Sequence, residues 1–136
     1  MAQTATEQGY AIVQKTALGF QEAVEKAKAE LKSEGFGVLC EIDVKATLKE
    51  KLGVDREPYV ILGACNPQFA HQAMEAEPNL GVLLPCNVVV YREDGETYVA
   101  AVAPERMLSI VGNERLGPIA TEVRKRLAAV VQRVAG

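Results

Sequence analysis

Two cysteines in nearly matching settings are the residues of this chain most suited to chemistry. Cys65 and Cys86 each adjoin a strongly apolar run, and each is followed by an asparagine, Asn66 or Asn87. Cys65 would lie where a strand ends and a helix begins. The positive end of a helix dipole and its unpaired N–H groups favour a thiolate at such a position. His71, the only histidine, falls on the same predicted helix.

These residues leave several kinds of chemistry open. Cys65 and His71 are residue types that can serve as a thiolate nucleophile and its base. If the two cysteine-bearing strands are neighbours, Cys65, Cys86 and His71 would instead supply three soft metal ligands, with Glu41 or Asp43 as a fourth. No Cys-x-x-Cys spacing supports a metal site, and a redox disulfide is a further alternative. Cysteine is also a small hydrophobe that is often buried, so simple packing accounts for both thiols as well.

The asparagines have structural roles available besides ligand binding. Asn66 precedes Pro67, and this pair is typical of a helix start. Asn87 would need hydrogen-bond partners if it is covered, and it would then fix the register of a partner chain or bind a polar ligand. The candidate ligand-binding residues are therefore Cys65, Asn66, His71, Cys86 and Asn87. The sequence names no cofactor and does not decide whether the protein is an enzyme.

Composition excludes several classes of function. The net charge is −3, so no overall positive field attracts nucleic acid. The apolar runs are too short to span a membrane. The chain has neither a nucleotide-binding glycine loop nor a protease or hydrolase motif, and only two serines. Three cysteines, an odd number, favour reduced thiols in the cytoplasm over a disulfide scaffold.

The first third of the chain predicts a strand, a helix and a second strand. Residues 1–8 are polar and read as a disordered N-terminal tail, which leaves 9–136 as a single domain. A strand over Tyr10–Lys15 is followed by a helix for which Thr16 is the expected N-cap. Residues alternate in polarity over Phe36–Val44, which predicts a strand with Cys40 packed in the core.

The central part predicts a short helix, a buried strand and another helix. Asp43 or Thr47 is placed to cap the short helix. Tyr59–Cys65 is apolar throughout, which is typical of a strand covered on both faces. The helix that Asn66 and Pro67 begin follows this third strand.

A β-hairpin is predicted around Asp94-Gly95, a strong signal for a two-residue turn. Pairing across that turn places Tyr91 opposite Tyr98 and leaves apolar side chains on both faces of the hairpin. Antiparallel sheets usually expose one face to water. We therefore expect helices on one face and a second copy of the chain on the other, since two-fold dimers are the commonest oligomers. Further helices are expected after Pro104 and over 119–134.

Several segments resemble the uncharacterised bacterial and archaeal family known as domain of unknown function 302. The resemblance covers about residues 10–134. It implies homodimers and a β-α-β4-α arrangement similar to the TATA-box-binding-protein-like fold, an α+β class with a curved antiparallel sheet and helices on one face. The predicted helix after the third strand is an addition to this topology. The resemblance implies no activity and no catalytic residues. The matching segments are Gly35–Val44 (GFGVLCEIDV), Thr47–Gly53 (TLKEKLG), Ile61–Pro67 (ILGACNP) and Gly81–Tyr91 (GVLLPCNVVVY).

Three hypotheses about function follow. The first is a cytoplasmic homodimer that binds a small ligand or a soft metal in a cleft near Cys65 and Cys86. The second is a structural or interaction dimer without small-molecule chemistry. The third is a thiol-dependent enzyme that uses Cys65 with His71 as its base.

Overall fold

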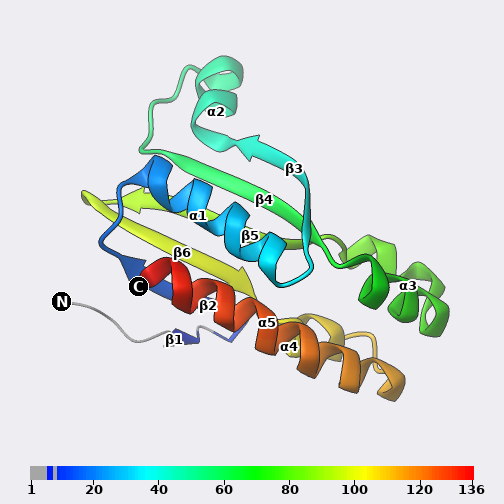
Figure 1. Cartoon of the computed structure of the whole chain (residues 1–136). Helices are drawn as coiled ribbons and strands as arrows, with labels where there is room; N and C mark the ends of the chain where they lie inside the picture. Colours follow the sequence, from blue (N-terminus) through cyan, green and yellow to red (C-terminus); the bar gives the residue numbers. More distant parts are fainter. Residues whose placement is uncertain (1–5, 8) are drawn as a thin grey trace.

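The strands form one antiparallel sheet in the computed structural model, which describes residues 6–7 and 9–136 (Figure 1). Residues 1–5 and 8 of the expected tail lie outside the described part. Neighbouring strands follow the order β1-β2-β6-β5-β4-β3, and each pair is antiparallel. The strands are β1 (Thr6–Glu7), β2 (Ala11–Thr16), β3 (Gly37–Asp43), β4 (Tyr59–Cys65), β5 (Cys86–Glu93) and β6 (Glu96–Val102). The predicted α+β class is confirmed.

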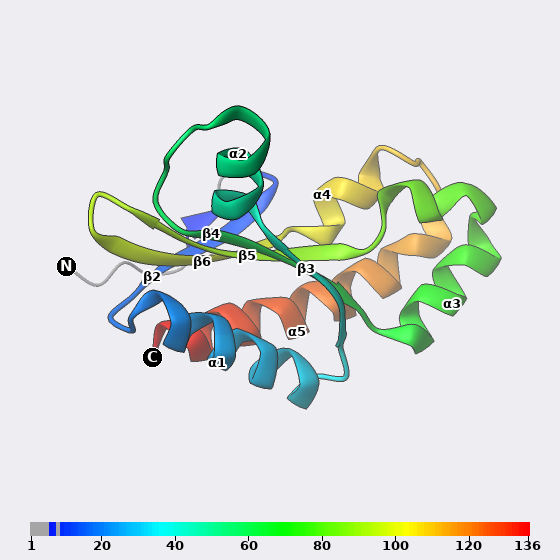
Figure 2. The ribbon, with the colours of Figure 1, turned by 90° about the horizontal axis from the view of Figure 1, so that it is seen from above.

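The helices divide between the two faces and one end of the sheet. Figure 2 shows α1 and α5 on one face, α2 on the other, and α3 beyond the end of the strands. The helix predicted after the third strand is confirmed as α3. No helix in the described ranges is long and apolar enough to cross a membrane. The helices are α1 (Phe20–Ser33), α2 (Val44–Leu52), α3 (Pro67–Ala76), α4 (Pro104–Ser109) and α5 (Gly117–Ala135), with 3₁₀ turns η1 (Pro78–Leu83) and η2 (Glu114–Leu116).

Two hydrophobic clusters hold these elements together. The main cluster joins one face of the sheet to α1 and α5, with Leu62, Val88 and Leu127 fully buried. A second, smaller cluster lies beyond the strand ends between α3, η1, α4, η2 and α5. Its buried members are Ala73, Leu80, Leu108, Leu116 and Ala120.

The face away from α1 and α5 carries an unbroken line of apolar residues, here named the apolar row. Backbone pairing aligns its members across five strands, because each lies directly opposite the next. Beside it, the rings of Tyr59, Tyr91 and Tyr98 stack with centroids 5.3 and 5.2 Å apart. The pairing of Tyr91 with Tyr98 confirms the predicted hairpin register. The apolar row consists of Val13, Ala100, Val89, Ile61 and Ile42.

The prediction that Thr16 caps the first helix is wrong. Thr16 is the last residue of β2, and Gly19 takes the N-cap position. The Thr16 hydroxyl instead donates to the carbonyl oxygen of Val134, 2.9 Å away, and accepts from the Leu18 N–H. The side chain thus ties β2 to the end of α5, because the helix begins later than the pattern suggested.

The prediction that Cys40 packs in the core is also wrong. The pairing of β3 with β4 shifts between Val38 and Cys40, as in a β-bulge. Val38 still packs against the main cluster, whereas Cys40 is exposed. One extra residue in a strand moves every later side chain to the other face of the sheet. The alternation of polarity over Phe36–Val44 therefore assigned Cys40 to the wrong face.

Candidate functional site

An apolar cavity lies where the two hydrophobic clusters meet at the end of the sheet. The volume that the centre of a water-sized sphere can occupy inside the cavity is about 40 Å³. A single water molecule needs about 10–15 Å³ of such volume, so the cavity is larger than a one-water site. Almost every side chain around it is apolar, which is typical of a ligand pocket rather than of a water channel. The lining includes Phe36, Ala64, Phe69, Met107, Ile119 and Val123.

The structure brings Cys65 and Cys86 together on this cavity, as the hypothesis of neighbouring strands required. Strand β4 pairs with β5, with Ala64 opposite Cys86, and both cysteines contribute to the lining. Both thiols are free, Cys65 half-buried and Cys86 buried. Burial, and to a lesser degree the charge of a Cys65 thiolate, raises the pKa of the Cys86 thiol to about 11. Cys86 is therefore protonated at neutral pH and a poor nucleophile or metal ligand.

Asn66 occupies the predicted N-cap of α3 and also reaches the cavity. Its Oδ1 accepts a hydrogen bond from the Phe69 N–H at 3.3 Å, and Pro67 follows as the first helical residue. The side chain is buried and contributes to the cavity lining. The cap fixes where the helix begins, and this start places Phe69 and Ala73 of α3 against the cavity.

His71 is not brought to the cysteines. It lies on the outer side of α3 with 76% of its side chain exposed, and its Nε2 is 3.8 Å from Glu75 Oε1. It is not among the residues that line the cavity. The paired nucleophile and base are therefore not assembled in this arrangement.

The residues considered as metal ligands are dispersed. Within the described ranges, no three His, Cys, Asp or Glu side chains are grouped to hold a metal ion. Glu41 instead forms an ion pair with Lys28 at 2.6 Å. Asp43 accepts from the Ala46 N–H and caps α2, the role that the sequence allowed it.

Asn87 lies apart from the cavity. It is exposed and sits opposite Gly63 in the pairing of β4 with β5. A Cβ on Gly63 would lie 3.9 Å from Asn87 Oδ1. Asn87 therefore shares the face of Cys40, whereas Cys86 points into the main cluster.

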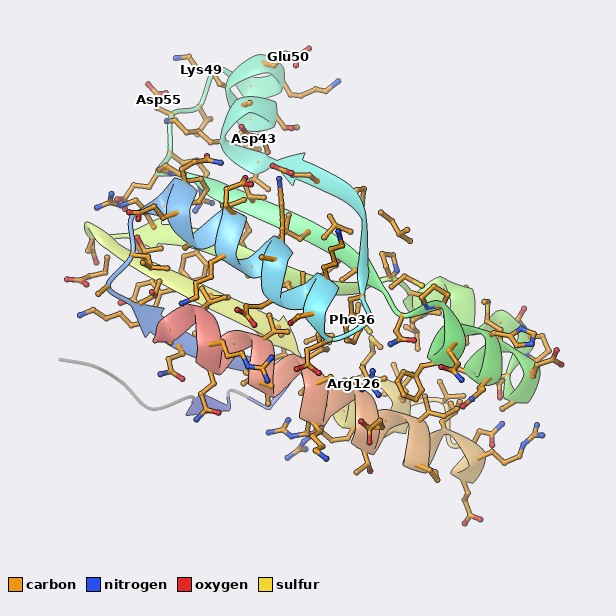
Figure 3. The ribbon with its side chains drawn as sticks, viewed as in Figure 1. Phe36, Asp43, Lys49, Glu50, Asp55 and Arg126 are labelled. Atoms are coloured by element: carbon orange, nitrogen blue, oxygen red, sulfur yellow. The ribbon has the colours of Figure 1, made fainter. Side chains whose placement is uncertain are left out.

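Arg126 and Phe36 border the site and were not predicted. Figure 3 shows them where the end of α1 approaches α5. The Arg126 guanidinium lies over the ring of Phe69, 5.0 Å from its centroid. Its Nη1 donates to the Glu34 carbonyl oxygen at 3.1 Å. No local pattern identifies Arg126, because its partners come from distant parts of the chain.

Comparisons with known proteins agree with this architecture. The family model described as "Domain of unknown function DUF302" matches residues 12–134. A crystal structure of an uncharacterized conserved DUF302 protein from Bacillus stearothermophilus is 36% identical, with a TM-score of 0.87. The match covers 92% of this chain and 98% of that one. No curated protein matches the chain.

Proposed function

Because this chain belongs to the DUF302 family, whose description assigns no activity, we propose a function from the cavity itself. The protein is a cytoplasmic homodimer that binds a small, largely apolar molecule beside Cys65 and Cys86. The observation that carries this proposal is the partly open apolar cavity at the junction of the two hydrophobic clusters. Cavities of this kind, with few polar groups at their edge, are the usual sites for small ligands.

Binding fits the surroundings of the cysteines better than thiol catalysis does. The raised pKa of Cys86 keeps that thiol neutral, and a neutral thiol behaves as a small apolar side chain. His71 is too exposed to serve as a base at the cavity. Both cysteines then act as lining residues.

Filling the cavity tests the proposal. Ala70 is half-buried on α3 and lines the cavity, so Ala70→Leu places extra carbon atoms in the space. Hexanol serves as a neutral apolar probe, followed by amide chemical shifts in a ¹H–¹⁵N NMR titration. We expect shifts for cavity residues in the parent protein and an affinity at least about tenfold lower in Ala70→Leu, because cores do not accept added volume freely.

A matched variant controls for the general effect of a larger side chain. Ala29 is exposed on α1, away from the cavity, so Ala29→Leu makes the same chemical change elsewhere. It is expected to bind hexanol as the parent does. Saturating hexanol without any shift at the cavity would refute ligand binding there.

The homodimer is supported by the apolar row. Ile42 is 44% exposed, and Ile61 and Val89 are half-buried in the isolated chain. Among the described residues, α2 makes its main contacts with the sheet at β4, and Val13 and Ala100 at the other end of the row are already buried. The surface left for a partner is therefore centred on Ile42, Ile61 and Val89. A symmetric partner that places the same face against it buries this surface on both subunits.

Light scattering at micromolar concentration tests the dimer. Val89→Lys places a charge in the middle of the apolar row and is expected to give a monomer that keeps its far-UV circular dichroism. Val82→Lys is the control, because Val82 is 85% exposed and lies in η1, outside the sheet. A parent protein that is monomeric would remove the dimer from the proposal and leave the cavity unaffected.

A further inference from the structure

Two nitrogen donors converge on one point beside the cavity. A Cβ built on Gly35 would lie 3.0 Å from Asn66 Nδ2 and 3.4 Å from Arg126 Nη1. Gly35 has a positive φ of 85° and no side chain, so both groups approach its backbone closely and lie near each other. The next residue, Phe36, already lines the cavity, and it lies close to Arg126 in Figure 3.

The side-chain amide of Asn66 has N–H groups that no acceptor among the described residues uses. Only 9% of the residue is exposed, and its Oδ1 already accepts from the Phe69 N–H. Among the described residues, its Nδ2 donates to no acceptor. This N–H group, at the edge of the apolar cavity that Asn66 lines, is therefore available to an acceptor on a ligand.

Arg126 also keeps unused donors, although its position is firmly fixed. Its Nε donates to Glu122 at 3.0 Å and its Nη1 to the Glu34 carbonyl oxygen at 3.1 Å. A guanidinium has five N–H groups, so three remain without a partner among the described residues. The aromatic ring of Phe69 supports the guanidinium from the cavity side.

The local charge favours an anion at this point. The groove between the end of α1 and α5 contains three cations, Lys125, Arg126 and Arg133, and two carboxylates, Glu34 and Glu122. Both carboxylates are already paired, Glu34 with Arg133 and Glu122 with Arg126. The N-terminal end of α3, which Asn66 caps, adds the positive end of a helix dipole.

We propose that the ligand is an aliphatic carboxylate, an inference that rests on the proposed binding function. Its carboxylate accepts hydrogen bonds from Asn66 Nδ2 and from the unused N–H groups of Arg126 beside Gly35. Its alkyl chain runs past Phe36 and Phe69 into the apolar cavity. Charged acceptors strengthen such bonds, and a guanidinium matches the two oxygens of a carboxylate. The limited space of about 40 Å³ selects a short chain.

The experiment compares hexanoate with hexanol, which share the alkyl chain and differ in the head group. NMR titrations follow the Asn66 side-chain amide, the Arg126 Nε–H and the cavity residues in the full chain. We expect hexanoate to bind at least about tenfold more tightly than hexanol, since hydrogen bonds to a charged group account for a factor of this order. Only hexanoate is expected to shift the Asn66 side-chain amide.

Two variants identify the head-group site. Asn66→Asp keeps an oxygen for the helix cap but replaces the Nδ2 donor with a negative charge, so it should lose the preference for hexanoate and still bind hexanol. Arg126→Gln should likewise reduce the preference for hexanoate over hexanol. Lys51→Gln on α2 makes the same charge change on an exposed residue away from the cavity and should leave both affinities unchanged.

The outcomes separate this inference from the function on which it rests. Equal binding of hexanoate and hexanol, unaltered in Asn66→Asp, would overturn the carboxylate site and leave an apolar binding cavity. Binding of neither probe would overturn both. If Lys51→Gln also loses hexanoate binding, the preference for hexanoate over hexanol comes from the overall charge of the protein. That result would also overturn the carboxylate site.

Discussion

The sulfur of Cys40 occupies the space beside Gly63 on the sheet face away from α1 and α5. A Cβ on Gly63 would lie 2.6 Å from Cys40 Sγ and 3.1 Å from Pro85 Cγ. Cys40 and Gly63 are direct neighbours in the pairing of β3 with β4. The bulge that exposes Cys40 therefore also explains why this strand interior has a glycine, which otherwise weakens a strand.

Gly63→Ala is expected to lower the free energy of unfolding by about 1–3 kcal/mol, because the added methyl group overlaps Cys40 and Pro85. Urea denaturation measures the effect. The double variant Cys40→Ala with Gly63→Ala should recover part of the loss, because it removes the nearer of the two atoms. A Gly63→Ala protein as stable as the parent would contradict the close contact.

Stability should fall at alkaline pH because of Cys86. The folded protein holds the proton of this thiol up to a pKa of about 11, whereas an unfolded cysteine loses it near about 8.5. Above the unfolded pKa the folded state binds more protons, so the free energy of unfolding decreases as pH rises from about 9 to about 11. The shift corresponds to a loss on the order of 2–3 kcal/mol.

Cys86→Ala separates this effect from the titration of tyrosines and lysines. The variant is less stable at neutral pH because it loses buried volume, but its stability should decline less between pH 9 and 11 than that of the parent. Denaturation curves at several pH values give the difference. Parallel declines in the two proteins would show that Cys86 does not carry the effect.

Asn66 should matter for the stability of α3 through its cap. Asn66→Ala removes the acceptor of the Phe69 N–H and is expected to cost about 0.5–2 kcal/mol. Asn66→Asp retains a capping oxygen and should remain close to the parent. Thermal and urea unfolding of the two variants provide the measurement, and equal losses in both would argue against the cap.

Tyr91 should be the most important ring of the tyrosine stack, since it contacts both Tyr59 and Tyr98. Tyr91→Leu keeps an apolar side chain but removes two ring contacts, each worth about 0.5–1.5 kcal/mol. Tyr59→Leu removes one contact and is expected to cost about half as much. A larger loss in Tyr59→Leu than in Tyr91→Leu, measured by urea denaturation, would contradict this ranking.

Features governed by neighbouring residues could be predicted from the sequence. Asp94 and Gly95 both adopt positive φ at the hairpin turn, as the turn type requires, and this fixed the register of Tyr91 with Tyr98. Asn66 and Pro67 marked the start of α3 because a cap and a first-turn proline act within a few residues. The approach of Cys65 and Cys86 was expected only on the condition that their strands are neighbours, and the pairing of β4 with β5 meets that condition.

Features that depend on distant residues or on a single insertion could not be predicted. The bulge at Val38 and Cys40 leaves no mark in the alternation that it interrupts. Which side of α3 His71 occupies depends on how that helix packs against the rest of the chain. Arg126 joins the site only because α5 crosses the end of α1, so its role required the tertiary structure.

The second cluster has a kinetic consequence. It contains five buried residues, whereas the main cluster contains twenty of those described. An element held by few apolar contacts opens more often than one in the main core, and such local opening is measured by amide hydrogen exchange. The amides of α3 and η1 should therefore exchange with deuterium sooner than those of β5, and this transient loosening gives a molecule from solvent its route inward without unfolding the sheet.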